Sequence, residues 1–331
     1  MKRNKWIVTA ALFAVLMLVV SGCATNQAEK IEPQTLKVAA LSGPTGMGMA
    51  PMIADGVDLG EGVKTEFTVA TAPDQITAGI INGEYQIAAV PTNLAAVLYN
   101  KTEGAVILGA VNTMGTLSIV ADKSEPISGI ADLKGKTILA TGQGSTPEVV
   151  LNYLLKENNL IPNEDVIIEW LPEHAEAAAK LASGEGKIAL LPQPFATTAL
   201  AKNSNLQLAV DITEAWSQAT DGMQLEMGCV IVNKDWADKN QALVKKFMEE
   251  YEKSVTTINK ADEQAGELIA EAGIIENAKM AQKAIPNCGI TFIPVAEAEA
   301  DLQPYYEILA DFEPKSVGGK VPGEEFYKLA Y

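Results

Sequence analysis

A glycine- and hydroxyl-rich segment, Thr141–Glu148, carries the clearest potential for chemistry in this sequence. It follows the apolar run 137–140, which is typical of a strand, and precedes 149–155, whose apolar residues have helical spacing. Glycines allow a close backbone approach to a ligand, and the N–H groups at a helix start donate hydrogen bonds. The segment therefore predicts a ligand cradle formed by Gln143, Gly144, Ser145 and Thr146.

This cradle does not match two common nucleotide-binding loops. A P-loop ends in Gly-Lys-Ser or Gly-Lys-Thr, and that ending is missing here. Pro147 stands where a dinucleotide fingerprint would have its third glycine. The segment nevertheless follows a strand of an α/β pattern, which is where open α/β sheets bind ligands. An ordinary strand-to-helix turn is the alternative that the sequence leaves open.

The surrounding sequence predicts two α/β units, because strand and helix patterns alternate from Leu36 to about Thr213. In the first unit we expect strands at 36–41, 67–70, 86–90 and 105–110, and helices at 49–53, 75–81 and 94–99. In the second we expect strands at 116–120, 137–140, 166–170, 187–191 and 206–211, and helices at 149–155, 175–182 and 195–202. A strand at 224–232 then returns to the first unit, followed by helices at 241–259, 261–272, 278–284 and 295–312.

Residues 1–22 have the pattern of a secretory signal peptide. Lys2, Arg3 and Lys5 precede an apolar stretch at 6–20 that is short for a membrane span. The following residues, 20–23, resemble a lipobox, which implies cleavage before Cys23 and lipidation of Cys23. We expect residues 23–35 to form a flexible, lipidated tether. A plain signal peptide with an incidental cysteine is the alternative.

The charge balance narrows the classes of partner. The net charge of −17 argues against nucleic acid and against a polybasic membrane surface. Arg3 is the only arginine in the sequence, so none remains after removal of residues 1–22. Without a guanidinium fork, a strongly anionic ligand is disfavoured. A neutral, polar small molecule such as a heterocycle fits better, and a sulfonate or nitrate held by the helix start at Ser145 and Thr146 is the second candidate.

The remaining cysteines and the single histidine leave two questions open. Outside the cytoplasm, Cys229 and Cys288 could form a disulfide, or each could be a small buried apolar residue. The lone histidine, His174, either caps the helix that follows it or contacts a ligand. With one histidine and no Cys-x-x-Cys pair, we expect no metal and no other cofactor.

Three phrases of the sequence carry a resemblance to a known family. They are Gly79–Pro91, Ile130–Ile138, and Lys180–Leu191, which repeats the pattern of the first. With the lipobox and the returning strand, they resemble an extracytoplasmic solute-binding protein of the periplasmic-binding-protein type II fold. The nearest group is the nitrate/sulfonate/bicarbonate type, which includes thiamine-precursor binders. The resemblance implies two lobes, each a mostly parallel sheet flanked by helices, joined by two crossing strands.

The same resemblance implies the lobe boundaries and the residues that line the cleft between the lobes. Lobe 1 would comprise 36–115 and 225–331, and lobe 2 would comprise 116–224. Lobe 1 would contribute Thr45, Gly46, Met47, Gly48, Thr92, Asn93, Asn112 and Thr113. Lobe 2 would contribute the cradle residues together with His174, Gln193 and Phe195, and Met227 would lie on the returning strand.

The resemblance further implies the substrate-binding subunit of an ABC importer, with a cognate permease and ATPase as partners. We expect a monomer, anchored by lipid outside the cytoplasm, that captures a small polar solute and catalyses no reaction. A ligand-sensing surface lipoprotein is one alternative. An enzyme on the same fold that uses His174 as acid or base is another, although no nucleophile–base pair is visible.

Overall fold

The computed structural model describes residues 33–329. The predicted signal peptide, the lipidation at Cys23 and nearly all of the tether lie outside the described residues. Within residues 33–329, no helix is long and apolar enough to span a membrane.

One sheet has six strands in the order β11-β4-β10-β3-β1-β2. The strands β1, β2 and β3 are parallel, and β10 lies antiparallel between β3 and β4. Their bounds are β1 Gln34–Leu41, β2 Val63–Ala70, β3 Ile87–Pro91, β4 Val106–Thr113, β10 Gly228–Asn233 and β11 Ile290–Pro294. The late strand β10 therefore returns to the first sheet, as the sequence predicts.

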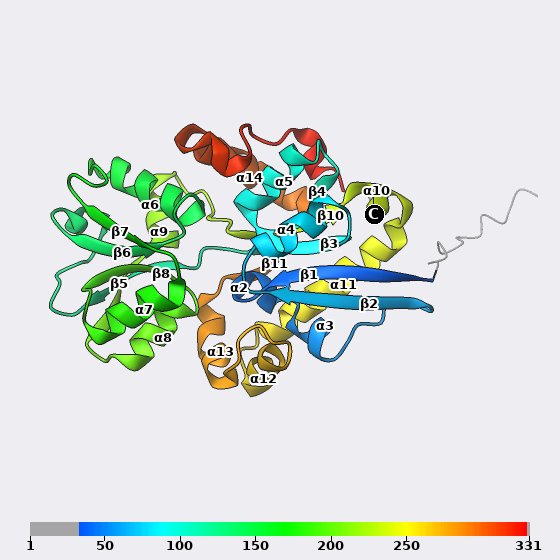
Figure 1. Ribbon diagram of the computed structural model, residues 1–331, viewed down its shortest axis with the longest axis horizontal. Helices are drawn as coiled ribbons and strands as arrows, with labels where there is room; N and C mark the ends of the chain where they lie inside the picture. Colours follow the sequence, from blue (N-terminus) through cyan, green and yellow to red (C-terminus); the bar gives the residue numbers. More distant parts are fainter. Residues whose placement is uncertain (1–32, 330–331) are drawn as a thin grey trace, which may run out of the picture.

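The other sheet has five strands in the order β7-β6-β8-β5-β9, and only β5 is antiparallel to its neighbours. All five of its strands come from one continuous stretch of the chain. The bounds are β5 Leu117–Asp122, β6 Thr137–Thr141, β7 Ile167–Leu171, β8 Ile188–Pro192 and β9 Leu206–Asp211. We refer below to the six-stranded unit and the five-stranded unit, each meaning a sheet with the helices that pack on it (Figure 1).

Helices cover both faces of the six-stranded sheet because its strands alternate between two cores. Leu36, Val38 and Ala40 face one core, and Ala39 and Leu41 face the other. The first core is shared with α2 Pro44–Met47, α3 Ala50–Ala54, α10 Lys234–Lys239, α11 Gln241–Ile258, α12 Glu263–Glu271 and α13 Ala278–Ala284. The second is shared with α4 Asp74–Ile81, α5 Thr92–Lys101, α14 Val295–Phe312, and the short helices η3 Pro314–Val317 and η4 Glu324–Tyr327.

The five-stranded sheet is covered in the same way, by α6 Thr146–Glu157 and α9 Ile212–Ala219 on one face and by α7 His174–Ser183 and α8 Phe195–Lys202 on the other. The core under α6 and α9 is continuous with the core under α5 and α14. Two further contacts join the units, α14 against α6 and α13 against α8. The units thus touch through helices as well as through the chain that links them.

The structure does not contain the disulfide that the sequence left open. Cys229 and Cys288 are both free and buried. Cys229 faces the core shared with α5 and α14, whereas Cys288 packs in the core shared with α11. Because these cores lie on opposite faces of the six-stranded sheet, the two thiols cannot pair. The buried-thiol alternative describes both residues.

Several element bounds differ from the expected ones. The returning strand begins at Gly228 rather than at Gln224, and the expected loop after β1 contains the short helix α2. The elements α9, α10 and β11 are not among the expected ones. By contrast, α13 and α14 have the expected bounds, 278–284 and 295–312.

Candidate ligand-binding site

In the six-stranded sheet, the carboxyl ends of the parallel strands meet at the edge from which the chain crosses to the other sheet. Pro91, at the end of β3, and Thr113, at the end of β4, both pair with Gly228, the first residue of β10. The first crossing leaves from Thr113, and the second arrives at Gly228. This edge therefore carries the strand ends and both crossings.

The five-stranded sheet presents the matching edge. Leu117, the first residue of β5, pairs with Pro192 at the end of β8, and Ser118 pairs with Asp211 at the end of β9. Only residues 114–116 separate β4 from β5. The two carboxyl edges consequently face each other across the crossings, in the position where open α/β sheets bind ligands.

Three loops of the five-stranded unit bring predicted site residues together. They follow β6, β7 and β8, which are neighbours in the sheet. Thr141 Oγ1 and His174 Nδ1 lie 2.5 Å apart in a hydrogen bond, and the His174 ring centroid is 5.2 Å from that of Phe195. Gln193 is 3% exposed, and its Oε1 accepts a hydrogen bond from the Thr197 hydroxyl. His174 and Phe195 therefore form one half-buried aromatic pair beyond the ends of β7 and β8.

Burial controls the charge of His174. It lowers the pKa of the imidazole below its ordinary value, and the neighbouring Glu173 carboxylate opposes this only in part. The ring is therefore neutral at pH 7. Its Nδ1 is engaged by Thr141, and none of the hydrogen bonds among the described residues uses Nε2. The ring is able to offer Nε2 to a ligand while it rests on Phe195.

The predicted cradle before α6 is formed mainly by backbone. Gly142 and Gly144 have φ values of 83° and 75°, which glycine adopts without strain. Ser145 precedes the helix as its N-cap residue, but its hydroxyl donates to the Gly142 carbonyl at 2.6 Å instead of capping the helix. Glu148 Oε2 accepts from the Gly144 N–H at 2.6 Å. The Glu148 side chain therefore already occupies one of the backbone N–H groups that we expected to bind a ligand.

The cradle residues differ in exposure. Gln143 and Gly144 are exposed and Ser145 is half-buried, whereas Thr146 is 3% exposed. The first three thus remain accessible at the edge of the sheet. Thr146 instead faces α14, where its hydroxyl interacts with that of Tyr305.

The predicted loop of the six-stranded unit is packed closely. Asn112 Nδ2 donates to the Thr45 carbonyl at 2.9 Å, which holds α2 against the end of β4. A Cβ on Gly46 would lie 2.0 Å from the Leu41 carbonyl oxygen, and one on Gly48 would lie 2.8 Å from the Tyr251 hydroxyl. At both positions, the Cβ of any other residue would clash with these neighbouring atoms.

Met47 does not lie where the sequence analysis expected it. Its side chain is 0% exposed and packs in the core with α3 and α11. The reason is local: residues 44–47 form a helical turn, and that turn directs Met47 inward. The side chain of Met47 therefore does not reach the surface of the predicted loop.

The other predicted residues of this edge are buried and bonded. The N–H of Thr92 donates to the Met227 carbonyl at 3.1 Å, and Asn93 Nδ2 donates to the Ser316 carbonyl at 3.3 Å. The Thr113 hydroxyl donates to Asn112 Oδ1 at 3.0 Å. The first of these bonds fastens the end of β3 to the second crossing, and the Met227 N–H fastens the end of β4 by donating to the Thr113 carbonyl at 2.9 Å. The Thr92 hydroxyl is an exception, because it interacts with the Cys229 thiol without meeting the geometry of a hydrogen bond.

The sequence analysis missed Glu226, which lies on the second crossing between α9 and β10. It is 1% exposed, and its Oε2 has no hydrogen-bond partner. Burial, assisted by the negative charge of Asp301, raises the pKa of its carboxyl to about 8. A signal was present in the sequence, because a lone carboxylate stands in the otherwise apolar run 225–232.

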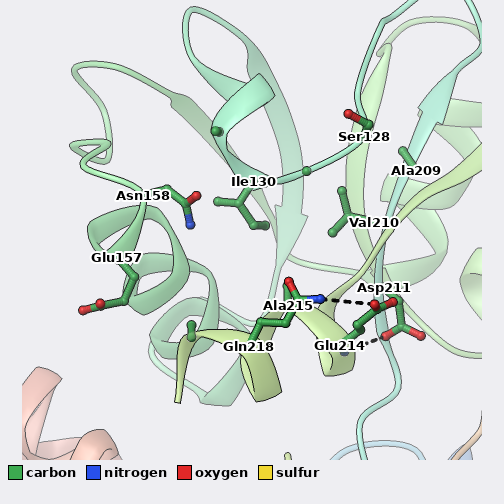
Figure 2. Close-up of a pocket in the computed structure, with 13 residues that line it drawn as sticks. Ser128, Ile130, Glu157, Asn158, Ala209, Val210, Asp211, Glu214, Ala215 and Gln218 are labelled. Atoms are coloured by element: carbon green, nitrogen blue, oxygen red, sulfur yellow. Dashed lines mark hydrogen bonds between the residues drawn. The ribbon is translucent and has the colours of Figure 1, made fainter. Parts of the chain in front are cut away.

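A separate cavity of about 560 Å³ lies on the five-stranded unit (Figure 2). It runs between η1 Ile130–Leu133, the end of α6, β9 and α9, and its lining includes Glu157, Asp211 and Glu214. Asp211 Oδ1 accepts from the Thr213 N–H at 2.8 Å and so caps α9. None of the predicted site residues lines this cavity.

Comparison with known proteins agrees with the facing-edge geometry. A family model described as "ABC transporter, phosphonate, periplasmic substrate-binding protein" matches residues 54–278. No curated protein matches the chain.

Solved structures share the fold, the first two below over nearly their whole length. An ABC transporter protein from Parabacteroides distasonis is 25% identical with a TM-score of 0.75, covering 88% of this chain and 98% of the other. The periplasmic aliphatic sulphonate-binding protein of Escherichia coli is 18% identical with a TM-score of 0.71, covering 90% and 98%. The periplasmic nitrate-binding protein of Synechocystis is 12% identical with a TM-score of 0.55, covering 73% and 67%.

Proposed function

Since the chain belongs to the phosphonate family of periplasmic ABC-transporter substrate-binding proteins, we propose that it captures a small polar solute between its two units and passes it to a membrane permease driven by an ATPase. The observation that carries this proposal is the pair of facing carboxyl edges joined by two crossings. The family consists of binding proteins, so the hypothesis of an enzyme based on His174 is not retained. No specific observation favours the sensor hypothesis.

We propose that the two units are the two lobes, with lobe 1 at 36–115 and 225–331 and lobe 2 at 116–224. The membership of the two sheets supports this division, because β10 and β11 join β1–β4 while β5–β9 form the second sheet. The lobes would close about residues 114–116 and 220–227, and ligand would favour the closed state.

The proposed contacts are those predicted residues that remain accessible on the facing edges. Each of them is half-buried or exposed and lies just beyond a strand end or on a crossing. They are Thr45, Gln143, Gly144, Ser145, His174, Phe195 and Met227. The buried residues Gly46, Gly48, Asn112, Thr113 and Gln193 would shape the site from behind.

The decisive experiment identifies the solute. Exported protein, purified without denaturant, should release a small molecule on denaturation that mass spectrometry detects in near-stoichiometric amount. Gly144→Val should lose this molecule, because nothing lies within 4 Å of a Cβ at Gly144 and the added side chain would project into the cleft.

Gly184→Val is the matched control for that variant. Gly184 also has a positive φ, 85°, and a Cβ added there would also have nothing within 4 Å, but this glycine lies at the far end of α7. Both variants therefore carry similar backbone strain. Equal retention of solute by the two variants would contradict the proposed position of the cleft.

We also propose that the protein is monomeric and is held outside the cytoplasm by lipid on Cys23. The lipobox-like residues 20–23 support the anchor. Cys23→Ala should therefore move the protein from the detergent phase to the aqueous phase in a detergent-partition assay. A variant that partitions like the wild type would show that Cys23 is not the anchor.

A further inference from the structure

The hydrogen bond between Thr141 and His174 decides which ring nitrogen of His174 carries the proton. Thr141 Oγ1 lies 2.5 Å from His174 Nδ1, and no other hydrogen bond among residues 33–329 uses this hydroxyl. A hydroxyl both donates and accepts, whereas a neutral imidazole has one nitrogen of each kind. If Nδ1–H donated to Thr141, which is 2% exposed, the hydroxyl hydrogen would be buried without an acceptor. The hydroxyl therefore donates to Nδ1, and the ring proton lies on Nε2.

The position of the ring keeps it from taking a second proton at pH 7. His174 is the first residue of α7, and the amino end of a helix disfavours a positive charge. Burial acts in the same direction and lowers the pKa of the imidazole, while the carboxylate of Glu173 opposes both effects only in part. The ring is therefore neutral and is held in a single form, with Nδ1 as acceptor and Nε2–H as donor.

The Nε2–H group is the end of the ring that the protein leaves for a solute. None of the hydrogen bonds or ion pairs that the structure describes involves Nε2. The ring is held at its other nitrogen by Thr141, and it lies against Phe195 with 5.2 Å between the ring centroids and 40° between the ring planes. The donor thus has a fixed position on the carboxyl edge of the five-stranded sheet, which faces the crossings.

We propose that His174 selects the solute by donating its Nε2–H to a hydrogen-bond acceptor, and that Thr141 is the positioning residue that fixes this form of the ring. A carbonyl oxygen, an unprotonated ring nitrogen and an oxyanion oxygen share the required chemistry. A cation that carries only N–H groups lacks it and is rejected at this point, because two donors would meet. The inference rests on the proposed function and narrows it.

Nitrogen-15 NMR tests the form of the ring without knowledge of the solute. His174 is the only histidine in the sequence, so protein made without a histidine tag gives imidazole signals from this residue alone. Protonated and unprotonated ring nitrogens resonate in well-separated ranges. At pH 7 we expect Nε2 in the protonated range and Nδ1 in the unprotonated range.

Thr141→Val tests the positioning role, because it keeps the branched shape and removes the hydroxyl. We expect the ring of this variant to populate both neutral forms, and its affinity for a bound probe to fall by the fraction of rings that leave the Nε2–H form. Thr137→Val is the matched control. Thr137 is exposed at the opposite end of the same strand, so this variant should change neither the NMR signals nor the affinity.

Three probes at millimolar concentration test the selection. Uracil offers neutral carbonyl acceptors, methanesulfonate offers oxyanion acceptors, and guanidinium is a flat cation with N–H donors only. We expect at least one of the first two to shift the Nε2–H signal and to slow its exchange with water. Guanidinium should do neither.

Substitution of His174 measures the contribution of this bond and the charge of the acceptor. His174→Met should weaken the probe that binds by about 2- to 13-fold if its acceptor is neutral and by about 13- to 150-fold if it is charged. His174→Gln keeps an N–H donor in a similar place and should lose less than His174→Met.

Three outcomes would overturn the inference. They are a wild-type ring protonated on Nδ1, a failure of both acceptor probes to shift the Nε2–H signal, and equal affinity of the bound probe for the wild type and His174→Met. None of them removes the proposed function. That function is tested separately by the molecule released from the native protein and by its loss in Gly144→Val.

Discussion

Gly115→Ala should weaken solute binding by about 5- to 150-fold, which corresponds to the roughly 1–3 kcal/mol cost of overpacking a tight site. A Cβ at Gly115 would lie 1.9 Å from Thr213 Oγ1 and 2.8 Å from Thr213 Cβ. The other side of the crossing is also fixed, because the Met114 N–H donates to the Gly289 carbonyl at 2.8 Å. The added methyl group must therefore push the two units apart. Calorimetry with the released solute measures the effect.

A second substitution separates this clash from a general loss of stability. Thr213→Gly removes the atoms that the new methyl group would meet and keeps the backbone N–H that bonds Asp211. We expect Gly115→Ala with Thr213→Gly to bind more tightly than Gly115→Ala alone. If the double variant binds no better, the clash is not the cause and the first crossing does not limit closure.

Trp216→Ala should lower the free energy of unfolding by about 3–5 kcal/mol, the range for large aromatic residues in a core. Trp216 is 0% exposed, and its ring centroid lies 5.1 Å from that of Tyr153 on α6 and 5.9 Å from that of Tyr305 on α14. Loss of the indole leaves a cavity where the two units share one core. Urea unfolding followed by circular dichroism measures the change, and separation of the transition into two steps would show the units uncoupled.

Trp170→Ala supplies the comparison. Trp170 lies on β7 at the border of the five-stranded sheet and is only half-buried. It packs only against the border of the shared core, so loss of an indole of the same size there should cost less. Equal midpoints for Trp216→Ala and Trp170→Ala would argue against a special role for the shared core.

Much of the fold could be predicted because its strands are buried on both faces. Such strands give continuous apolar runs, as in 87–90 and 188–191, and the helices between them keep apolar residues at helical spacing. Strand β11 escaped prediction for the opposite reason. It lies at the border of its sheet, most of its residues are half-buried, and it ends in Pro294.

The site was harder to predict than the fold. Position along the chain correctly indicated which loops follow strands, but it did not indicate where each side chain points. Met47 turns into the core because of a helical turn of four residues that has no clear signal in the sequence. Glu226 is buried because its chain neighbours Leu225 and Cys229 pack in one core with Tyr305 and Tyr306 of the distant helix α14. Tertiary contacts of this kind cannot be derived from local pattern.

The antiparallel strand β10 has a consequence for the order of folding. Strands β3 and β4 each pair with β10 and not with each other, so the six-stranded sheet has no continuous ladder until residues 228–233 are available. The five-stranded sheet needs only residues 117–211. The unit that begins the chain is therefore the one whose assembly must wait, because its central strand arrives after the whole of the other sheet has been made. The six-stranded unit must bring β10 back across the long chain segment that forms the other sheet. The five-stranded unit can fold from contacts that are nearer in sequence.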